Sequence, residues 1–377
     1  MKINQRHIKR ERQMEKRYLR ALSMIFALIW CALPSCIETF ELDYVLESDA
    51  IVVTGLITDK APAYVELTAP AATPISGLSA ILRISGASIT LVEDTGGREQ
   101  LTEVRNGYYE GQTPGVVGRS YFVEIVLPDD RLIVSTPQQI KPNPSIDRLY
   151  TEQVSTFRSF GGGVEFDYRG LNLNVYLNRE DTVSRYYRWI VGGSYEFYSA
   201  LDSENENGPC YYTIPQLPSF NVGESASANA DIISKRLKFI TPNSTYAFGH
   251  SVELVQYSQT KESYDYWKKI EDQQRNVGSI FDPPPAQITG NLNFDDGEKG
   301  VVMGFFEAAS VKNKRIFLNR DSFTNLDPSI DYFSDTGINA PCYPPPGWTG
   351  PWNPPDWCFD CALLENSTRT KPLYWPN

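Results

Sequence analysis

Histidine, the side chain that most often serves as a catalytic base or metal ligand, is scarce in this 377-residue chain. His7 and His250 are its two histidines, too few for a multi-histidine metal site. A catalytic His250 would need a nucleophile beside it, and no Gly-x-Ser-x-Gly motif supplies one. We therefore expect His250 to be a structural residue of a β-strand, with a catalytic base as the alternative.

Carboxylates are numerous, but their spacing singles out no catalytic pair. Asp202, Glu204 and Glu206 alternate in a polar segment that resembles a calcium loop. The segment lacks the glycine at position six and the glutamate at position twelve of an EF-hand. We expect a solvated hairpin tip there, with calcium as the alternative, and we expect no catalytic residue, no other metal site and no cofactor. A hydrolase would need a specific carboxylate pair in a cleft.

Two of the six cysteines, Cys31 and Cys36, lie within or directly after a predicted export signal. A strongly basic segment precedes an apolar run at residues 21–33, and Leu33-Pro34-Ser35-Cys36 follows. The run is shorter than the roughly 20 residues that span a bilayer, so residues 1–35 are predicted to be a signal peptide. The segment before Cys36 resembles a bacterial lipobox. We expect lipidation at Cys36, with simple cleavage or a buried thiol as the alternative.

The four remaining cysteines are Cys210, Cys342, Cys358 and Cys361. An even number in an exported chain predicts two disulfides, for which three connectivities are open. We favour Cys342–Cys358 and Cys210–Cys361. A redox or zinc role for Cys358-x-x-Cys361 is the alternative, but the motif lies in a proline-rich tail rather than at the start of a helix, and no second such pair accompanies it.

That tail is rich in aromatic residues. Seven prolines and three tryptophans lie between Pro341 and Trp357. In one interpretation the segment is a disulfide-closed cap that buries its aromatic rings. In the other it presents an aromatic surface that binds a sugar, a peptide or a partner protein. The candidate contact residues are Tyr343, Trp348, Trp352 and Trp357.

The composition of the chain constrains both its partners and the kind of fold that holds these candidate residues. The formal charge of −11 argues against a nucleic-acid partner, since such proteins carry a basic face. Hydrophobic residues make up 41% of the chain, and Gly, Pro, Tyr and Phe are abundant, which favours a globular fold of strands and turns.

The pattern along the chain predicts a mainly β protein. Residues 36–49 form an acidic tether. Residues 50–140 show short strands separated by turns, typical of an immunoglobulin-like β-sandwich, and "GASITLVEDTGG…GYY…GRSYFVEI" resembles the carboxypeptidase-regulatory-like sandwiches. Prolines at 137, 142 and 144 mark a boundary. Residues 145–377 are predicted to form a larger β-rich domain with one main helix near 260–276, for which Thr260 is the N-cap.

Several segments together resemble one family. They are "SCIETFELDYVLESDAIVVTGLITD", "SYDYWKKIEDQQRNVGSIFDPPPAQITGNL", "GFFEAASVKNKRIFL" and "CFDC…KPLYWP". In this order they resemble the Bacteroidota outer-membrane lipoproteins grouped as domain of unknown function 4249, whose members are often encoded beside TonB-dependent receptors. The resemblance implies no reaction and no catalytic residue.

The functional expectation combines the export signal with this resemblance. We expect an outer-membrane lipoprotein, lipid-anchored and facing the cell surface. It would act without catalysis as an accessory or ligand-binding partner of a TonB-dependent receptor, and its ligand is not identified. The alternatives are a secreted glycan-active hydrolase and a structural or adhesive envelope protein.

Overall fold

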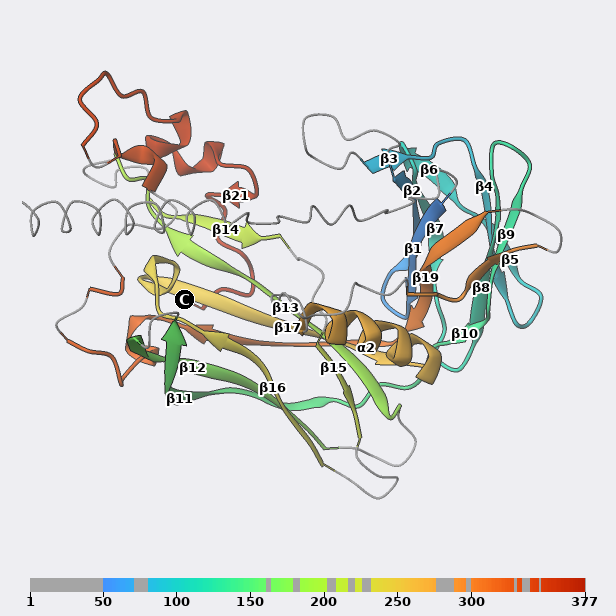
Figure 1. Cartoon of the computed structure of the whole chain (residues 1–377), viewed down its shortest axis with the longest axis horizontal. Coiled ribbons are helices and arrows are strands. Elements are labelled where there is room, and N and C mark those ends of the chain that lie inside the picture. The colour runs from blue at the N-terminus through green and yellow to red at the C-terminus, as the bar shows by residue number, and fades with distance from the viewer. Residues whose placement is uncertain are drawn as a thin grey trace, which may run out of the picture. The chain divides into compact units, whose positions relative to one another are not determined.

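The computed structural model describes most of the chain after the tether. The described ranges are 50–70, 81–160, 164–178, 184–201, 208–215, 221–225, 232–275, 288–295, 300–328, 331–333, 340–345 and 347–376. The signal peptide, Cys36, the tether and the calcium candidates Asp202, Glu204 and Glu206 lie outside them. The chain is mainly β with one main helix (Figure 1), which confirms the predicted fold class.

Two sheets form a β-sandwich. The first sheet has the order β19 (Val301–Ala309), β1 (Ala50–Thr58), β2 (Pro62–Pro70), β7 (Tyr108–Pro114) and β6 (Thr102–Arg105), and β3 (Ile81–Arg83) also pairs with β2. The second has the order β18 (Leu292–Phe294), β9 (Leu132–Ser135), β8 (Ser120–Val126), β4 (Ser88–Glu93) and β5 (Arg98–Gln100), and β10 (Gln138–Gln139) also pairs with β8.

Alternation along these strands explains the packing of the sandwich. In β2, Val65 and Leu67 are fully buried, whereas Tyr64 and Glu66 are partly exposed. Successive strand residues point to opposite faces of a sheet, so each sheet offers one apolar face. Side chains such as Val65, Ile89 and Ile125 from the two sheets form a single core cluster.

Two strands of the sandwich come from late in the sequence. Strand β19 runs parallel to β1, with Ala50 opposite Val301 and Thr58 opposite Ala309, and it lies beside β1 in Figure 1. Strand β18 pairs with β9. The residues of both strands were expected in the domain 145–377, with a strand predicted at Val301–Phe306 and a turn rather than a strand at 293–298. The structure differs because pairing partners far apart in the chain leave no local signal in the sequence.

A second pair of sheets follows residue 145. One has the order β11 (Ile146–Phe160), β12 (Val164–Asn178) and β16 (Ile232–Ile240). The other has the order β20 (Val311–Leu318), β17 (Gly249–Gln259), β13 (Tyr186–Phe197), β14 (Cys210–Ile214) and β21 (Ser367–Thr368), with β15 (Asn221–Glu224) also on β13. Leu173, Tyr187, Trp189 and Leu254 belong to the core cluster that these sheets share.

Helix α2 (Lys261–Arg275) matches the predicted helix. Thr260 Oγ1 accepts a hydrogen bond from the Ser263 backbone N–H at 3.2 Å, which satisfies a free donor of the first turn. The helix contacts β13, β15, β17 and β19, and Figure 1 shows it along β13 and β17. It therefore touches strands of both pairs of sheets.

Short 3₁₀ helices complete the described secondary structure. They are η1 (Ser244–Tyr246), η2 (Arg320–Ser322), η3 (Ala340–Cys342), η4 (Asp356–Cys358) and η5 (Cys361–Leu363). Across the described ranges, no helix has both the length and the apolar character needed to cross a membrane.

Candidate functional site

The proline- and tryptophan-rich segment is closed by a disulfide. We call residues 342–358, between the two bridged cysteines, the aromatic loop. The Cys342–Cys358 bridge has a Cα–Cα distance of 5.5 Å, and both cysteines are buried. The structure also contains the second favoured bridge, Cys210–Cys361. Of the three open connectivities, the structure therefore has the one that we favoured.

The loop presents three of its four predicted contact residues to solvent. Tyr343 is 44% exposed, Trp348 54% and Trp352 38%. The Trp348 and Trp352 rings meet edge to face, with centroids 6.3 Å apart. Trp357 is partly buried. The surface thus offers two neighbouring indoles, and Trp357 contributes less to it than its sequence position suggested.

The base of the loop is fixed to the sheet that contains β14. Cys361 is bridged to Cys210, the first residue of β14, and its backbone N–H donates to Ser199 Oγ at 2.8 Å. Asp360 accepts from Arg369 at 2.5 Å and from the Ala362 backbone N–H at 3.0 Å. The residues that follow the loop are therefore attached to β14 by a disulfide and to Ser199 by a hydrogen bond.

The end of the chain is anchored by Trp375. Its ring is 8% exposed and packs edge to face on Tyr211 and Phe317, with centroid distances of 5.0 and 5.5 Å. The Arg315 guanidinium lies 3.7 Å from the centroid of the Tyr374 ring. The two interpretations of the tail thus apply to different residues, because Trp375 is buried while Trp348 and Trp352 are exposed.

Exposed apolar side chains are concentrated in this part of the chain. Besides Tyr343, Trp348 and Trp352, Phe359, Leu363, Leu373 and Tyr374 are exposed. Single exposed apolar residues are normal on a protein surface, and it is their number in this segment that distinguishes it from the rest of the described chain.

His250 is a buried residue of β17. Its ring stacks on Tyr246 at 4.2 Å and on Tyr195 at 5.8 Å, and Thr245 Oγ1 lies 3.3 Å from Nδ1. Burial lowers the pKa of His250 to about 4. The expected position in a strand is confirmed, and the imidazole serves there as a packed aromatic ring.

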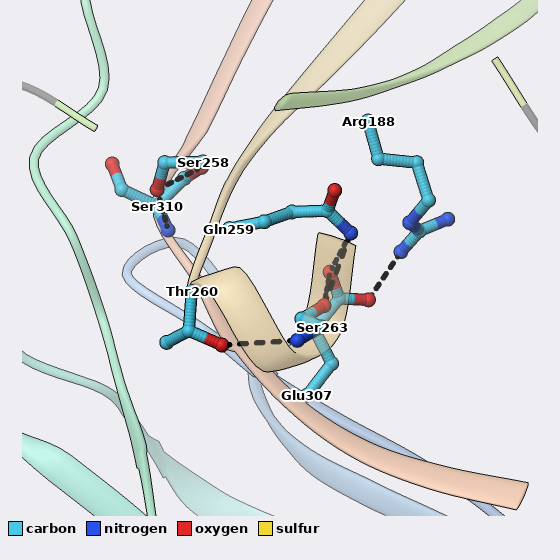
Figure 2. Close-up of polar contacts among 7 residues, drawn as sticks. All are labelled: Arg188, Ser258, Gln259, Thr260, Ser263, Glu307 and Ser310. Carbon is cyan, nitrogen blue, oxygen red and sulfur yellow. Dashed lines mark hydrogen bonds and ion pairs between the residues drawn. The ribbon is translucent and has the colours of Figure 1, made fainter. Parts of the chain in front are cut away.

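The structure also contains a buried polar cluster that the sequence analysis did not identify. Glu307 on β19 accepts hydrogen bonds from Arg188 Nη2 on β13 at 2.5 Å, from Gln259 Nε2 at 2.9 Å and from Ser263 Oγ at 3.0 Å (Figure 2). The Arg188 and Glu307 side chains are 7% and 3% exposed. The pair joins a strand of the sandwich to a strand of the second pair of sheets.

Aromatic rings flank the arginine of this cluster. The guanidinium carbon of Arg188 lies 4.6 Å from the Tyr257 centroid and 4.4 Å from the Trp267 centroid. A cation between two ring faces is stabilised by their negative electrostatic potential. A signal was present in the sequence, because Arg188 and Glu307 each interrupt a run of strongly apolar strand residues.

A second group of polar contacts fixes the point where β19 continues into β20. Ser310, between the two strands, donates from its backbone N–H to Ser258 Oγ at 3.0 Å (Figure 2). Its hydroxyl donates to Asp59 at 3.0 Å, and Asn143 Nδ2 donates to its carbonyl at 2.8 Å. These bonds hold the chain at the boundary between the sandwich and the following sheets.

In the part of the chain that the structure describes, no three His, Cys, Asp or Glu side chains are grouped so that they could hold a metal ion.

One family model matches the chain, that of the domain of unknown function (DUF4249), over residues 37–315, which is more than half of its length. No curated protein matches it. Arg188 and Glu307 lie inside the matched range and the aromatic loop follows it.

Proposed function

The chain belongs to the family of domain of unknown function 4249, and from that premise we propose that it is a lipid-anchored accessory protein of an outer-membrane TonB-dependent receptor. In this proposal Cys36 carries the lipid and residues 37–49 tether the folded part to the membrane. The protein binds its partner without catalysing a reaction.

The observation that carries the proposal is the exposure of Trp348 and Trp352 on a loop closed by a disulfide. Tryptophan and tyrosine dominate the energetics of protein interfaces, where truncating one side chain can cost about 2 kcal/mol or more. The bridge and the prolines restrict the loop before binding, so less conformational entropy is lost when a partner docks. We place the partner contact at Tyr343, Trp348 and Trp352.

The test is recovery of the receptor from native membranes. The double variant Trp348→Ala/Trp352→Ala is extracted in mild detergent beside the wild type, and the co-purifying receptor is quantified together with the melting temperature. Leu82→Ala is the matched control, because Leu82 on β3 is as exposed as Trp348 at 54%. We expect receptor recovery to fall in the double variant only, at an unchanged melting temperature.

Two results would contradict the proposed contact. Full recovery of the receptor by the double variant would exclude these indoles from the interface. A large fall in melting temperature would show that the rings are structural. The anchor is tested separately by palmitate labelling of the wild type and Cys36→Ala, where equal labelling of the two would reject lipidation at Cys36.

A further inference from the structure

A cavity of about 360 Å³ lies beside the Arg188–Glu307 pair. Its walls include Tyr64 on β2, Arg188 on β13, Tyr257 on β17, Tyr266 and Trp267 on α2, and Glu307 on β19. The volume is at the small end of the range of about 300–1,000 Å³ that ligand sites occupy. The mixture of aromatic rings with a few converging polar groups is also typical of ligand sites.

The cavity offers unused hydrogen-bonding groups. Arg188 is buried, yet its Nε has no hydrogen-bond partner among the described residues. The hydroxyl groups of Tyr64, Tyr257 and Tyr266 likewise make no hydrogen bond to any residue that the structure describes. Arg188 Nε is itself buried, whereas the three tyrosines are partly exposed, so a molecule bound in the cavity can supply hydrogen-bond partners to their hydroxyls.

The three phenols are neutral. Burial raises the pKa of Tyr64 to about 12 and also raises the pKa values of Tyr257 and Tyr266. A neutral phenol both donates and accepts a hydrogen bond. The walls therefore match a ligand whose own polar groups do both, as alcohols do.

The charges in the cavity argue against an ionic ligand. Arg188 and Glu307 form an ion pair, so their charges cancel and an anion gains little Coulomb attraction. The Glu307 carboxylate already accepts from three donors, and the Tyr257 and Trp267 faces are occupied by the Arg188 guanidinium. A cationic ligand therefore finds neither an open carboxylate nor a free aromatic cage.

We infer that this cavity binds one ring of a neutral sugar. The sugar hydroxyls would exchange hydrogen bonds with the hydroxyls of Tyr64, Tyr257 and Tyr266, while the apolar ring face packs against the apolar part of the wall, which includes Ile190 and Phe305. This site is separate from the aromatic loop and goes beyond the proposed docking function.

The experiment titrates the purified protein with four neutral probes: D-glucose, D-galactose, D-mannose and N-acetyl-D-glucosamine. Binding is followed by saturation-transfer NMR and calorimetry up to about 20 mM, which saturates a site of millimolar affinity. Sodium acetate and tetramethylammonium chloride are the anionic and cationic comparisons. We expect at least one sugar to bind saturably and more tightly than either ion.

Variants locate the binding. Tyr257→Phe and Tyr64→Phe each remove one hydroxyl and keep the ring, and each should weaken sugar binding about 3- to 10-fold. Tyr176→Phe, on β12 outside the cavity, and Trp348→Ala/Trp352→Ala, on the aromatic loop, should bind as the wild type does. Absence of saturable binding of all four sugars, tighter binding of either ion, or unchanged affinity in both cavity variants would overturn the inference. None of these results bears on receptor docking.

Discussion

The buried Arg188–Glu307 pair allows a sharp prediction about stability. Replacing Glu307 by methionine leaves the Arg188 guanidinium buried without a counter-charge and removes the acceptor of Gln259 and Ser263. Breaking a buried pair from one side costs about 3–5 kcal/mol of unfolding free energy. Arg188→Met should cost less, because Glu307 would keep two of its three donors.

The double variant Arg188→Met/Glu307→Met should recover most of this loss. Replacing a whole buried pair with apolar side chains is often neutral or stabilising, and the loss that remains comes from the Gln259 and Ser263 donors, about 1–2 kcal/mol. A double-mutant cycle should therefore give a coupling energy of at least about 3 kcal/mol. Urea unfolding, followed by tryptophan fluorescence, supplies the four midpoints and slopes.

A surface pair provides the control. Arg98 and Glu124 are also 2.5 Å apart, but their side chains are 53% and 30% exposed. Solvent screens such pairs, so Glu124→Met should leave the midpoint unchanged. The reasoning is refuted if Glu307→Met destabilises by less than about 1 kcal/mol, or if the two single effects simply add in the double variant.

Three further predictions concern other parts of the chain. Burial lowers the pKa of His250 to about 4, below its value in the unfolded chain, so the unfolded state binds more protons as the pH falls. The free energy of unfolding should therefore fall by about 2 kcal/mol between pH 7 and pH 5. His250→Phe should flatten this part of the profile of urea midpoint against pH, and an unchanged slope would contradict the assignment. Gly304 has φ +99°, and a Cβ there would lie 1.9 Å from a carbonyl oxygen, whereas Gly118 has φ +92° and open space around it. Gly304→Ala should therefore lower the free energy of unfolding by about 2 kcal/mol more than Gly118→Ala does. Equal melting temperatures of the two variants would disprove the close approach. Replacing Cys342 and Cys358 together by serine should lower the free energy of unfolding by up to about 3 kcal/mol and make the aromatic loop sensitive to protease. Protease resistance equal to that of the wild type would show that the bridge does not constrain the loop.

Local pattern was sufficient for several features. Alternating side chains predicted the strands of the sandwich, because burial on one sheet face imposes a period of two. Thr260 and the residues after it predicted α2, since an N-cap and helical periodicity are both local. The number of cysteines predicted two disulfides but left three connectivities open, and the proline-rich sequence around Trp348 and Trp352 was compatible with both a buried cap and an exposed surface.

Pairing between distant segments could not be predicted in the same way. Strand β19 is as apolar as its neighbours, and nothing in its sequence distinguishes pairing with β1, about 250 residues earlier, from pairing with a nearby strand. The expected domain 145–377 therefore included β19, whereas the structure pairs it with β1. The β18–β9 and β1–β19 pairings show that the chain returns to the sandwich before it enters β20.

The cavity also contains residues whose types are visible in the sequence but whose proximity is not. The order of residues alone shows which side chains are charged or aromatic and predicts many of the strands, but it leaves three cysteine connectivities open. The tertiary structure decided that Arg188 and Glu307, 119 residues apart, meet at 2.5 Å beside Tyr64, Tyr257 and Trp267. The physical reason is that a buried charge is stable only beside a partner, and the partner's identity depends on which strands lie next to each other rather than on any local sequence pattern.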